Sequence, residues 1–373
     1  MSSKKYYIEE DLYYSTVYGG GVYEWDGKQR VQDPLCGGSE LSPLLVNHIT
    51  GESFFMKRLE CSGEMLERYR RRILMPPAND HVLWPSDMVE YTDMGDDDQK
   101  EPCTLFVSRE YVADPTPVGR RSGGVALLFP YGGYPPMVEG TRLLAQIPNP
   151  NWKEPKIQRM AVQIALALES LNRTGYVYND MHLSRMYFLE NGKTYFDFSE
   201  LIVSFQDLVS RQAQRYCSVK PEYYPVEFAD PAVVRELVTH PDFNSQNYSL
   251  CALYFYLFMG RYAYDGRLLT GYVDDTIQNH YMKFRDYHKM PVFIFDPKNT
   301  ENAIGAFFEE EQVIELWQES PAELRELFVS TLAQGNAERT APVDNPTPSQ
   351  WLAVFRKLGW YNPNENQEAR TNE

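Results

Sequence analysis

The chain has 373 residues, of which 43% are hydrophobic and 14% aromatic, and its formal net charge is −16. This length accommodates one large domain or two modest ones, and the apolar content supports a sizeable core. The negative charge argues against nucleic-acid binding, because a phosphate backbone attracts a basic surface. No apolar run reaches the roughly 18 residues of a membrane-spanning helix, so no membrane span is predicted.

The N-terminus and the cysteines predict a cytoplasmic protein. The first residues lead into the acidic positions 9–11 and not into the apolar core of a signal peptide. The five cysteines are odd in number, widely spaced and contain no C-x-x-C pair. This pattern predicts free, mostly buried thiols in a reducing compartment.

The first 130 residues read mainly as strands and turns. Three glycines at positions 19–21 lie between two runs that contain Val-Tyr, and they predict a hairpin turn. A charged helix is expected over residues 62–74, ended by two prolines. A turn is expected at residues 50–52. Strand-like runs occupy residues 35–59, 82–91 and 125–129.

The remainder of the chain has a helical character. Residues 130–136 are rich in proline and glycine and predict a hinge between two halves. Apolar residues recur at helix spacing over residues 157–171, which predicts one long amphipathic helix. A second, buried helix is expected over residues 250–260, ended by glycine, and more helix over residues 310–333. The pattern therefore predicts an α+β protein with a small β-rich half followed by a larger helical half.

Two aspartates carry the strongest functional signal. Residues 178–185 read Tyr-Asn-Asp-Met-His-Leu-Ser-Arg, and residues 196–199 read Phe-Asp-Phe-Ser. Asp180 and Asp197 each follow an apolar, strand-like run. Phosphoryl transfer from ATP needs one carboxylate that orients a hydroxyl nucleophile and a second that holds a magnesium ion on the phosphates. The alternative is that both aspartates merely cap turns.

With these motifs, residues 35–355 resemble the protein kinase family. Residues 50–57 are similar to the family's third strand, and its lysine, here Lys57, contacts the α- and β-phosphates. Gly37 and Gly38 are the candidates for the glycine-rich loop, although a third glycine is missing. The glutamate that pairs with Lys57 is expected at Glu67, with Glu64 one turn away as the alternative, or the pair is absent.

The resemblance also implies the roles of the catalytic and metal-binding residues. Asp180 corresponds to the catalytic aspartate and Asp197 to the aspartate that holds Mg²⁺, so ATP and Mg²⁺ are the implied cofactors. Arg185 occupies the place of the asparagine that binds a second magnesium ion. A guanidinium has no acceptor atom and cannot ligate a cation. Either one metal site is lost, or Arg185 contacts phosphate directly, or nucleotide is not turned over.

Backbone groups of the hinge are expected to contact the adenine. In this chain the implied residues are Leu128, Phe129 and Tyr131. The resemblance further implies a buried ion pair between Glu227 and Arg339 in the helical half.

Several positions depart from the kinase pattern. Tyr178 and Asn179 replace the histidine and arginine before the catalytic aspartate, and Ser199 replaces a glycine. Gln246 stands where the family has an aspartate. His182 resembles a histidine in the catalytic loop of small-molecule phosphotransferases. These departures leave catalytic activity open.

The distal segments resemble one bacterial branch of the family, which is associated with von Willebrand A domain proteins and metal-dependent protein phosphatases. The implied function is a serine/threonine protein kinase that transfers the γ-phosphate of ATP to a protein hydroxyl. The alternatives are a catalytically impaired pseudokinase that acts as a binding scaffold and, less favoured, a small-molecule phosphotransferase. The implied partner is a protein substrate, a von Willebrand A domain protein or a protein phosphatase. The implied bilobal fold divides into an N-terminal extension at 1–34, an N-lobe and hinge at 35–134, a C-lobe at 135–361 and a polar tail at 362–373.

Overall fold

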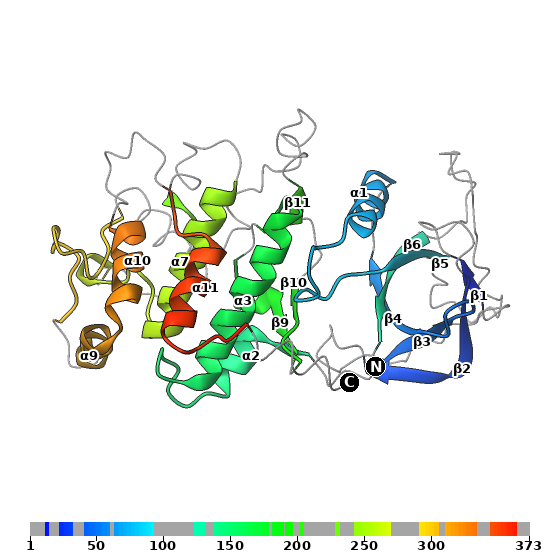
Figure 1. Ribbon diagram of the computed structural model, residues 1–373, viewed down its shortest axis with the longest axis horizontal. Coiled ribbons are helices and arrows are strands. Elements are labelled where there is room, and N and C mark those ends of the chain that lie inside the picture. The colour runs from blue at the N-terminus through cyan, green and yellow to red at the C-terminus, as the bar shows by residue number, and fades with distance from the viewer. Residues whose placement is uncertain are drawn as a thin grey trace. The chain divides into compact units, whose positions relative to one another are not determined.

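The structure is a computed structural model of the chain, and its mixture of helices and antiparallel sheet confirms the α+β class (Figure 1). The chain divides into two compact units, and each is described by itself. The first comprises Met1–Pro77, Leu83–Val138 and Leu189–Asn191, and the second comprises Ala78–Val82, Glu139–Phe188 and Gly192–Glu373. The structure describes residues 12–14, 22–32, 41–59, 63–92, 123–131, 137–178, 181–189, 191–196, 202–204, 228–231, 242–269, 291–305, 310–333 and 344–363.

The first unit is built on a curled, antiparallel sheet of six strands in the order β1-β2-β3-β4-β6-β5 (Figure 1). One helix, α1 (Gly63–Leu74), connects β4 to β5 in the chain, which confirms the helix expected over residues 62–74. The strands are β1 (Leu12–Tyr14), β2 (Val22–Gln32), β3 (Leu41–Asn47), β4 (Ser53–Leu59), β5 (Asp87–Thr92) and β6 (Gly123–Pro130).

The turn between β3 and β4 forms where the sequence predicts it. Asn47 Oδ1 accepts hydrogen bonds from the backbone N–H groups of Ile49 (2.8 Å) and Thr50 (3.1 Å). Gly51 has a φ of 72°, a conformation that costs glycine little because it has no Cβ. The turn fixes the register of β3 against β4, and therefore the face of the sheet on which Lys57 lies.

The predicted start of the strand over residues 82–91 is wrong. Val82 makes only an isolated bridge to Thr194, and β5 begins at Asp87. Pro85 lies between them, and proline has no N–H to donate to a sheet. Trp84 instead donates its indole N–H to the backbone carbonyl of Arg72 at the end of α1 (3.0 Å). This bond fixes the connection from α1 to β5.

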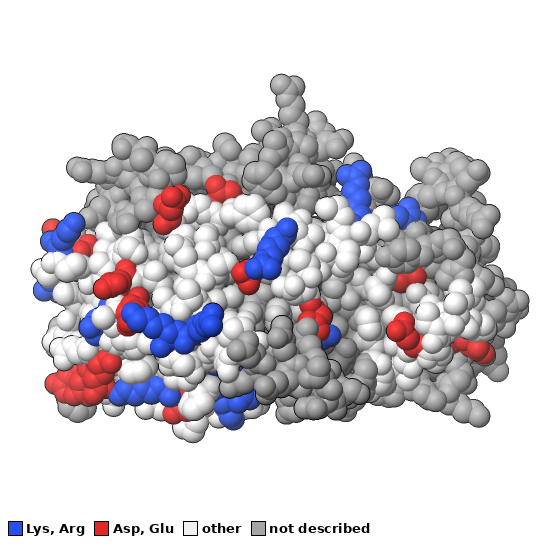
Figure 2. Space-filling view, in the orientation of Figure 1, with Lys and Arg blue, Asp and Glu red and all other residues white. Residues whose placement is uncertain are grey.

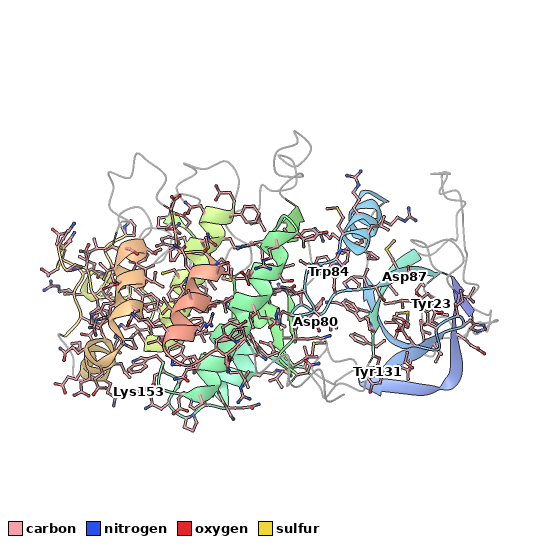
Figure 3. All side chains as sticks on the ribbon, in the orientation of Figure 1. Tyr23, Asp80, Trp84, Asp87, Tyr131 and Lys153 are labelled. Atoms are coloured by element: carbon pink, nitrogen blue, oxygen red, sulfur yellow. The ribbon has the colours of Figure 1, made fainter. Side chains whose placement is uncertain are left out.

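One face of the first sheet carries a cluster of buried residues. Tyr23 extends from β2 to Asp87, and its hydroxyl donates a hydrogen bond to Asp87 Oδ2 (2.7 Å; Figure 3). Asp87 is 1% exposed, and its Oδ1 accepts from the N–H of Met88 (2.7 Å). Nothing in the local sequence predicts this contact, because its two residues are far apart in the chain. The apolar members of this core cluster are Tyr23, Leu45, Phe54, Met56, Val89, Ala126 and Leu128.

The second unit contains two small sheets, in the orders β10-β9-β7 and β11-β8, together with helices, and the β10–β9 and β11–β8 pairs are antiparallel. Its strands are β7 (Val138–Glu139), β8 (Tyr176–Tyr178), β9 (Met186–Phe188), β10 (Thr194–Phe196) and β11 (Ile202–Ser204). Its helices are α2 (Gly140–Ala145), α3 (Pro155–Arg173), α7 (Phe243–Met259), α9 (Glu311–Glu319), α10 (Ala322–Leu332) and α11 (Pro348–Lys357). The described part of this unit also contains the short 3₁₀ turns η2 (Leu183–Arg185) and η4 (Arg267–Leu269).

The central helix α7 begins at Phe243, earlier than the predicted start at residue 250. Asp242 and Ser245 form a reciprocal capping box, which satisfies backbone N–H groups of the first turn. Ser245, Gln246 and Asn247 near the start of the helix are polar yet buried, so hydrophobic periodicity does not reveal them. The predicted end is confirmed: Gly260 caps the helix with a φ of 65°.

Aromatic rings fill the core around α7. Phe255 packs edge-on against Phe293 (5.2 Å) and Phe328 (5.3 Å), and Tyr254 packs edge-on against Trp351 (4.9 Å). These contacts join α7 to α10 and α11. Within the described residues, no helix is long and apolar enough to cross a membrane.

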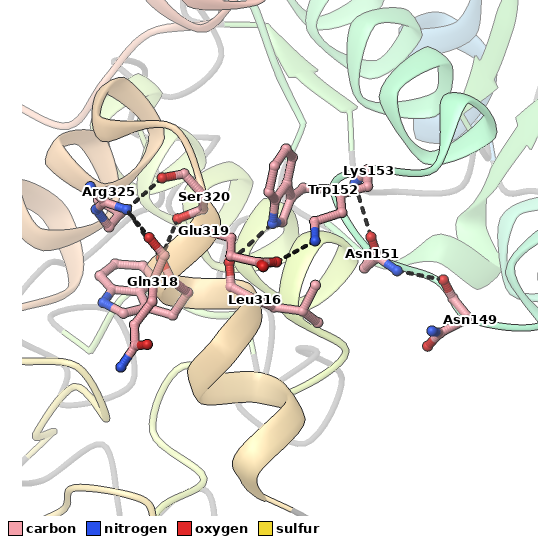
Figure 4. Close-up of polar contacts among 10 residues, drawn as sticks. Asn149, Asn151, Trp152, Lys153, Leu316, Gln318, Glu319, Ser320 and Arg325 are labelled. Carbon is pink, nitrogen blue, oxygen red and sulfur yellow. Dashed lines mark hydrogen bonds and ion pairs between the residues drawn. The ribbon is translucent and has the colours of Figure 1, made fainter.

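The helical content predicted over residues 310–333 is confirmed, and it forms two helices, α9 and α10, with Pro321 between them. The first, α9, has no buried residue; its Trp317 stacks on Phe295 (4.5 Å), and polar contacts also hold the helix (Figure 4). The Trp152 indole N–H donates to the carbonyl of Leu316 (3.1 Å), and Lys153 pairs with Glu319. Arg325 donates to the carbonyls at the end of α9, including that of Gln318 (2.8 Å).

Candidate functional site

The ends of β8 and β10 meet in the second unit. Tyr178 is the last residue of β8 and Phe196 the last residue of β10, and both side chains are fully buried. Their ring centroids lie 4.6 Å apart at an interplanar angle of 51°. Asp197 directly follows Phe196 in the sequence, and Asp180 follows Tyr178 by two residues. Both aspartates lie outside the described residues, but the strands that lead to them are those expected from the sequence.

Gln246 anchors the end of β8. Its Oε1 accepts the backbone N–H of Tyr178 (2.8 Å), and its Nε2 donates to Asn172 Oδ1 (3.1 Å). Gln246 lies on α7, Asn172 lies on α3, and Gln246 is 2% exposed. An ionised carboxylate is an acceptor only and would leave Asn172 without this donor. The sequence showed Gln246 only as a departure from the kinase pattern, whereas the structure shows how both ends of its amide are used.

The turn after Asp180 is held by hydrogen bonds of its own. His182 Nδ1 accepts the backbone N–H of Ser184 (3.1 Å) and lies 2.6 Å from Ser184 Oγ. Because Nδ1 accepts, a neutral imidazole here carries its proton on Nε2. The N–H of Arg185 donates to the carbonyl of His182 (3.0 Å), and the Tyr178 hydroxyl donates to the carbonyl of Arg185 (3.4 Å). The backbone of Arg185 is therefore fixed while its side chain is exposed.

Lys57 lies in the first unit, on the face of the sheet opposite the core cluster. It pairs with Leu127 of β6 and shares its face with Phe55 and Phe129, whose rings stack at 5.1 Å. The side chain of Lys57 is half-buried. Glu64 and Glu67 both belong to α1, but their side chains are not described, so the pair with Lys57 stays a prediction.

Gly37 and Gly38 fall between β2 and β3, which are antiparallel neighbours in the sheet. Both glycines lie outside the described residues, as do Glu227 and Arg339. The roles predicted for these four residues stay predictions.

Two backbone groups of the predicted adenine-binding segment are engaged within the first unit. The carbonyl of Leu128 accepts both the N–H (2.9 Å) and the hydroxyl (3.3 Å) of Ser86. The N–H of Tyr131 donates to the carbonyl of Ser53 (2.7 Å), and Figure 3 labels Tyr131 at this edge. A carbonyl has two lone pairs and an amide has one proton, so these two groups have no capacity left for a base.

No cluster of metal-ligating side chains is seen in what the structure describes. Within these residues, no group of three or more His, Cys, Asp and Glu side chains is arranged to hold a metal ion. Asp197, the predicted Mg²⁺ ligand, lies outside them. On the face shown in Figure 2, the described acidic and basic side chains are interspersed.

No family model matches this chain. A search of curated proteins likewise finds no relative.

Proposed function

We propose that the chain is a bilobal, protein-kinase-like phosphotransferase that moves the γ-phosphate of ATP to a protein hydroxyl. The observation that carries this proposal is the contact between Tyr178 and Phe196. Consecutive Cα atoms are about 3.8 Å apart, so Asp197 and Asp180 follow this contact by one and two such steps. Two aspartates that follow this contact so closely in the sequence would suit the joint task of positioning a hydroxyl and holding a metal on the phosphates.

The order of elements in the first unit supports the same proposal. The kinase resemblance calls for a glycine-containing loop between the two strands that precede the lysine strand, and for a helix directly after it. Here β2 and β3 flank Gly37 and Gly38, and β4 carries Lys57. Helix α1, which carries Glu67, follows β4.

The proposed chemistry assigns one task to each charged residue. Asp180 orients the acceptor hydroxyl and takes its proton, and Lys57 holds the α- and β-phosphates. Arg185, with its exposed side chain on a fixed backbone, supplies positive charge to the transferring phosphoryl group. Asp197 would hold Mg²⁺, which when bound neutralises charge on the phosphates. We propose the cytoplasm as the compartment, where ATP and Mg²⁺ are abundant.

A nucleotide titration tests the binding part of this proposal. Wild type, Lys57→Met and Asp197→Asn are titrated with ATP, with and without Mg²⁺. Wild type should bind more tightly with Mg²⁺, Lys57→Met should bind more weakly under both conditions, and Asp197→Asn should lose the Mg²⁺ effect. Identical curves for the three proteins would overturn the assignment of both residues.

A pseudokinase that serves as a scaffold is the second candidate, and the hinge favours it. The Tyr131 N–H and the Leu128 carbonyl are already bonded to Ser53 and Ser86. A binding module for a von Willebrand A domain protein or a phosphatase would not need an adenine site. This candidate predicts no transfer to any protein together with tight, nucleotide-independent binding of such a partner.

A further inference from the structure

Gly140 makes an unusually close approach to the candidate site. It is the first residue of α2, it is buried, and it directly follows β7. A Cβ built on Gly140 would lie 2.7 Å from the carbonyl oxygen of Leu183, 3.1 Å from Leu183 Cβ and 3.0 Å from Phe188 Cε2. Approaches below 3.0 Å are essentially never seen for real Cβ atoms, and the nearest atom here belongs to the backbone. Any larger residue therefore has to displace the Leu183 backbone.

The Leu183 carbonyl has a structural task in the turn that carries Arg185. It accepts the backbone N–H of Met186, and this bond closes the η2 turn. Met186 is also the first residue of β9. A displacement of the Leu183 carbonyl thus reaches Arg185 on one side and the start of β9 on the other.

The elements before and after Gly140 both contact the segment from η2 to β9. Before Gly140, β7 is the neighbour of β9 in the sheet of order β10-β9-β7, and after it α2 lies against η2. The other neighbour of β9 is β10, which ends at Phe196. Gly140 therefore lies between two elements that contact η2 and β9, and β9 pairs with β10, the strand that precedes Asp197 in the sequence.

We propose that Gly140 is a positioning residue: its missing side chain lets α2 seat the η2 turn and so places Arg185 for phosphoryl transfer. The proposal rests on the proposed function of the site. This positioning role is distinct from any effect of Gly140 on the stability of helix α2. Alanine is a better helix former than glycine, so without this contact Gly140→Ala would be neutral or stabilising.

The test compares Gly140→Ala with Ala145→Ser, which adds one atom at an exposed position of the same helix. The readouts are kcat, the KM for ATP, and amide hydrogen exchange over residues 181–188. Gly140→Ala should lower kcat by about tenfold or more, because small misplacements of catalytic groups cost up to about 100-fold. The KM for ATP should stay close to that of wild type, exchange over residues 181–188 should accelerate, and Ala145→Ser should match wild type.

A double variant locates the point of contact and guards against simple misfolding. Gly140→Ala/Phe188→Leu removes the ring contact and leaves the carbonyl contact, so it should fold more readily yet remain impaired. Full recovery in the double variant would overturn the proposal, because the Phe188 ring and not the Leu183 backbone would be the obstacle. Wild-type exchange and kcat in Gly140→Ala would overturn it as well. If wild type itself transfers no phosphate, the proposed function fails, while the exchange comparison still decides whether Gly140 sets the turn.

Discussion

The backbone N–H of Tyr178 donates to the side-chain oxygen of Gln246 across 2.8 Å, in a fully buried setting. This bond joins the last residue of β8 to the first turns of the central helix α7. The same amide group donates to Asn172 on α3 (3.1 Å). The strand that leads to Asp180 is therefore tied to two long helices through one side chain.

Replacing Gln246 with leucine should destabilise the protein. The Tyr178 N–H and Asn172 Oδ1 would both lose their partner, and an unsatisfied buried group costs about 1–3 kcal/mol. Chemical denaturation measures the change in the free energy of unfolding. An unchanged denaturation midpoint would show that the bond contributes nothing.

Replacing Gln246 with glutamate should make stability depend on pH. A protonated carboxyl can donate to Asn172 and accept from Tyr178, whereas an ionised one cannot donate and is buried. The pKa of this glutamate should therefore be raised in the folded state. The folded state then binds more protons than the unfolded state, so the free energy of unfolding falls as pH rises above about 4.3. Denaturation curves from pH 4 to pH 8, compared with wild type, should show this loss.

A buried ion pair ties the end of α7 to the start of α9. Arg261 Nη2 lies 3.0 Å from Glu310 Oε1, and Glu310 is 4% exposed. Glu310→Ala should destabilise the protein by about 1.5–3 kcal/mol, because it removes this charged hydrogen bond while Arg261 keeps its 3.9 Å contact with Asp265. The exposed pair of Lys357 and Glu323 is the control, since pairs in water contribute little, and Lys357→Met should leave the denaturation midpoint unchanged. Equal effects of the two changes would contradict this account.

We expect the chain to bind ATP and GTP with similar affinity. Because the Tyr131 N–H and the Leu128 carbonyl are engaged with Ser53 and Ser86, binding should depend mainly on the phosphates. The dissociation constants for ATP and GTP should then agree within about tenfold, the equivalent of about one neutral hydrogen bond. Competition titrations measure the ratio. A preference for ATP of about 1,000-fold would show that the hinge bonds open to admit adenine.

Arg185 separates an active enzyme from a pseudokinase. In an active enzyme Arg185→Ala should lower kcat without abolishing nucleotide binding, because the guanidinium acts on the transferring group. Arg185→Asn should recover part of the activity by restoring a metal ligand. Since the side chain is exposed, neither change should move the thermal midpoint appreciably. Activity unaffected by both substitutions would remove Arg185 from the site.

Local patterns in the sequence predicted the elements that local interactions stabilise. The periodic helix α3, the charged helix α1 and the Asn47–Gly51 turn all depend on residues close together in the chain. The strands before Asp180 and Asp197 were found for the same reason, since short apolar runs mark them. The start of α7 was missed because buried polar residues break its hydrophobic pattern.

Contacts between distant residues escaped prediction because neither partner alone carries a signal. Tyr23 and Asp87 meet across the sheet. The hydroxyl of Ser170 on α3 accepts the N–H of Asn79 (3.1 Å) and donates to its carbonyl (3.2 Å). The donor and acceptor tasks of Gln246 belong to the same class. The close packing of Gly140 against η2 is likewise not visible in the sequence, because it depends on Leu183, which is distant in the chain.

Transfer of labelled phosphate from ATP to a protein acceptor, or to the chain itself, tests the central claim most directly. Wild type should transfer phosphate, and Asp180→Asn should reduce kcat by about 100-fold or more while ATP still binds, because it removes the group that takes the proton. Asp344→Asn, an exposed carboxylate on the same unit, should behave as wild type. Equal transfer by wild type and Asp180→Asn, or no transfer by wild type to any acceptor, would contradict the account.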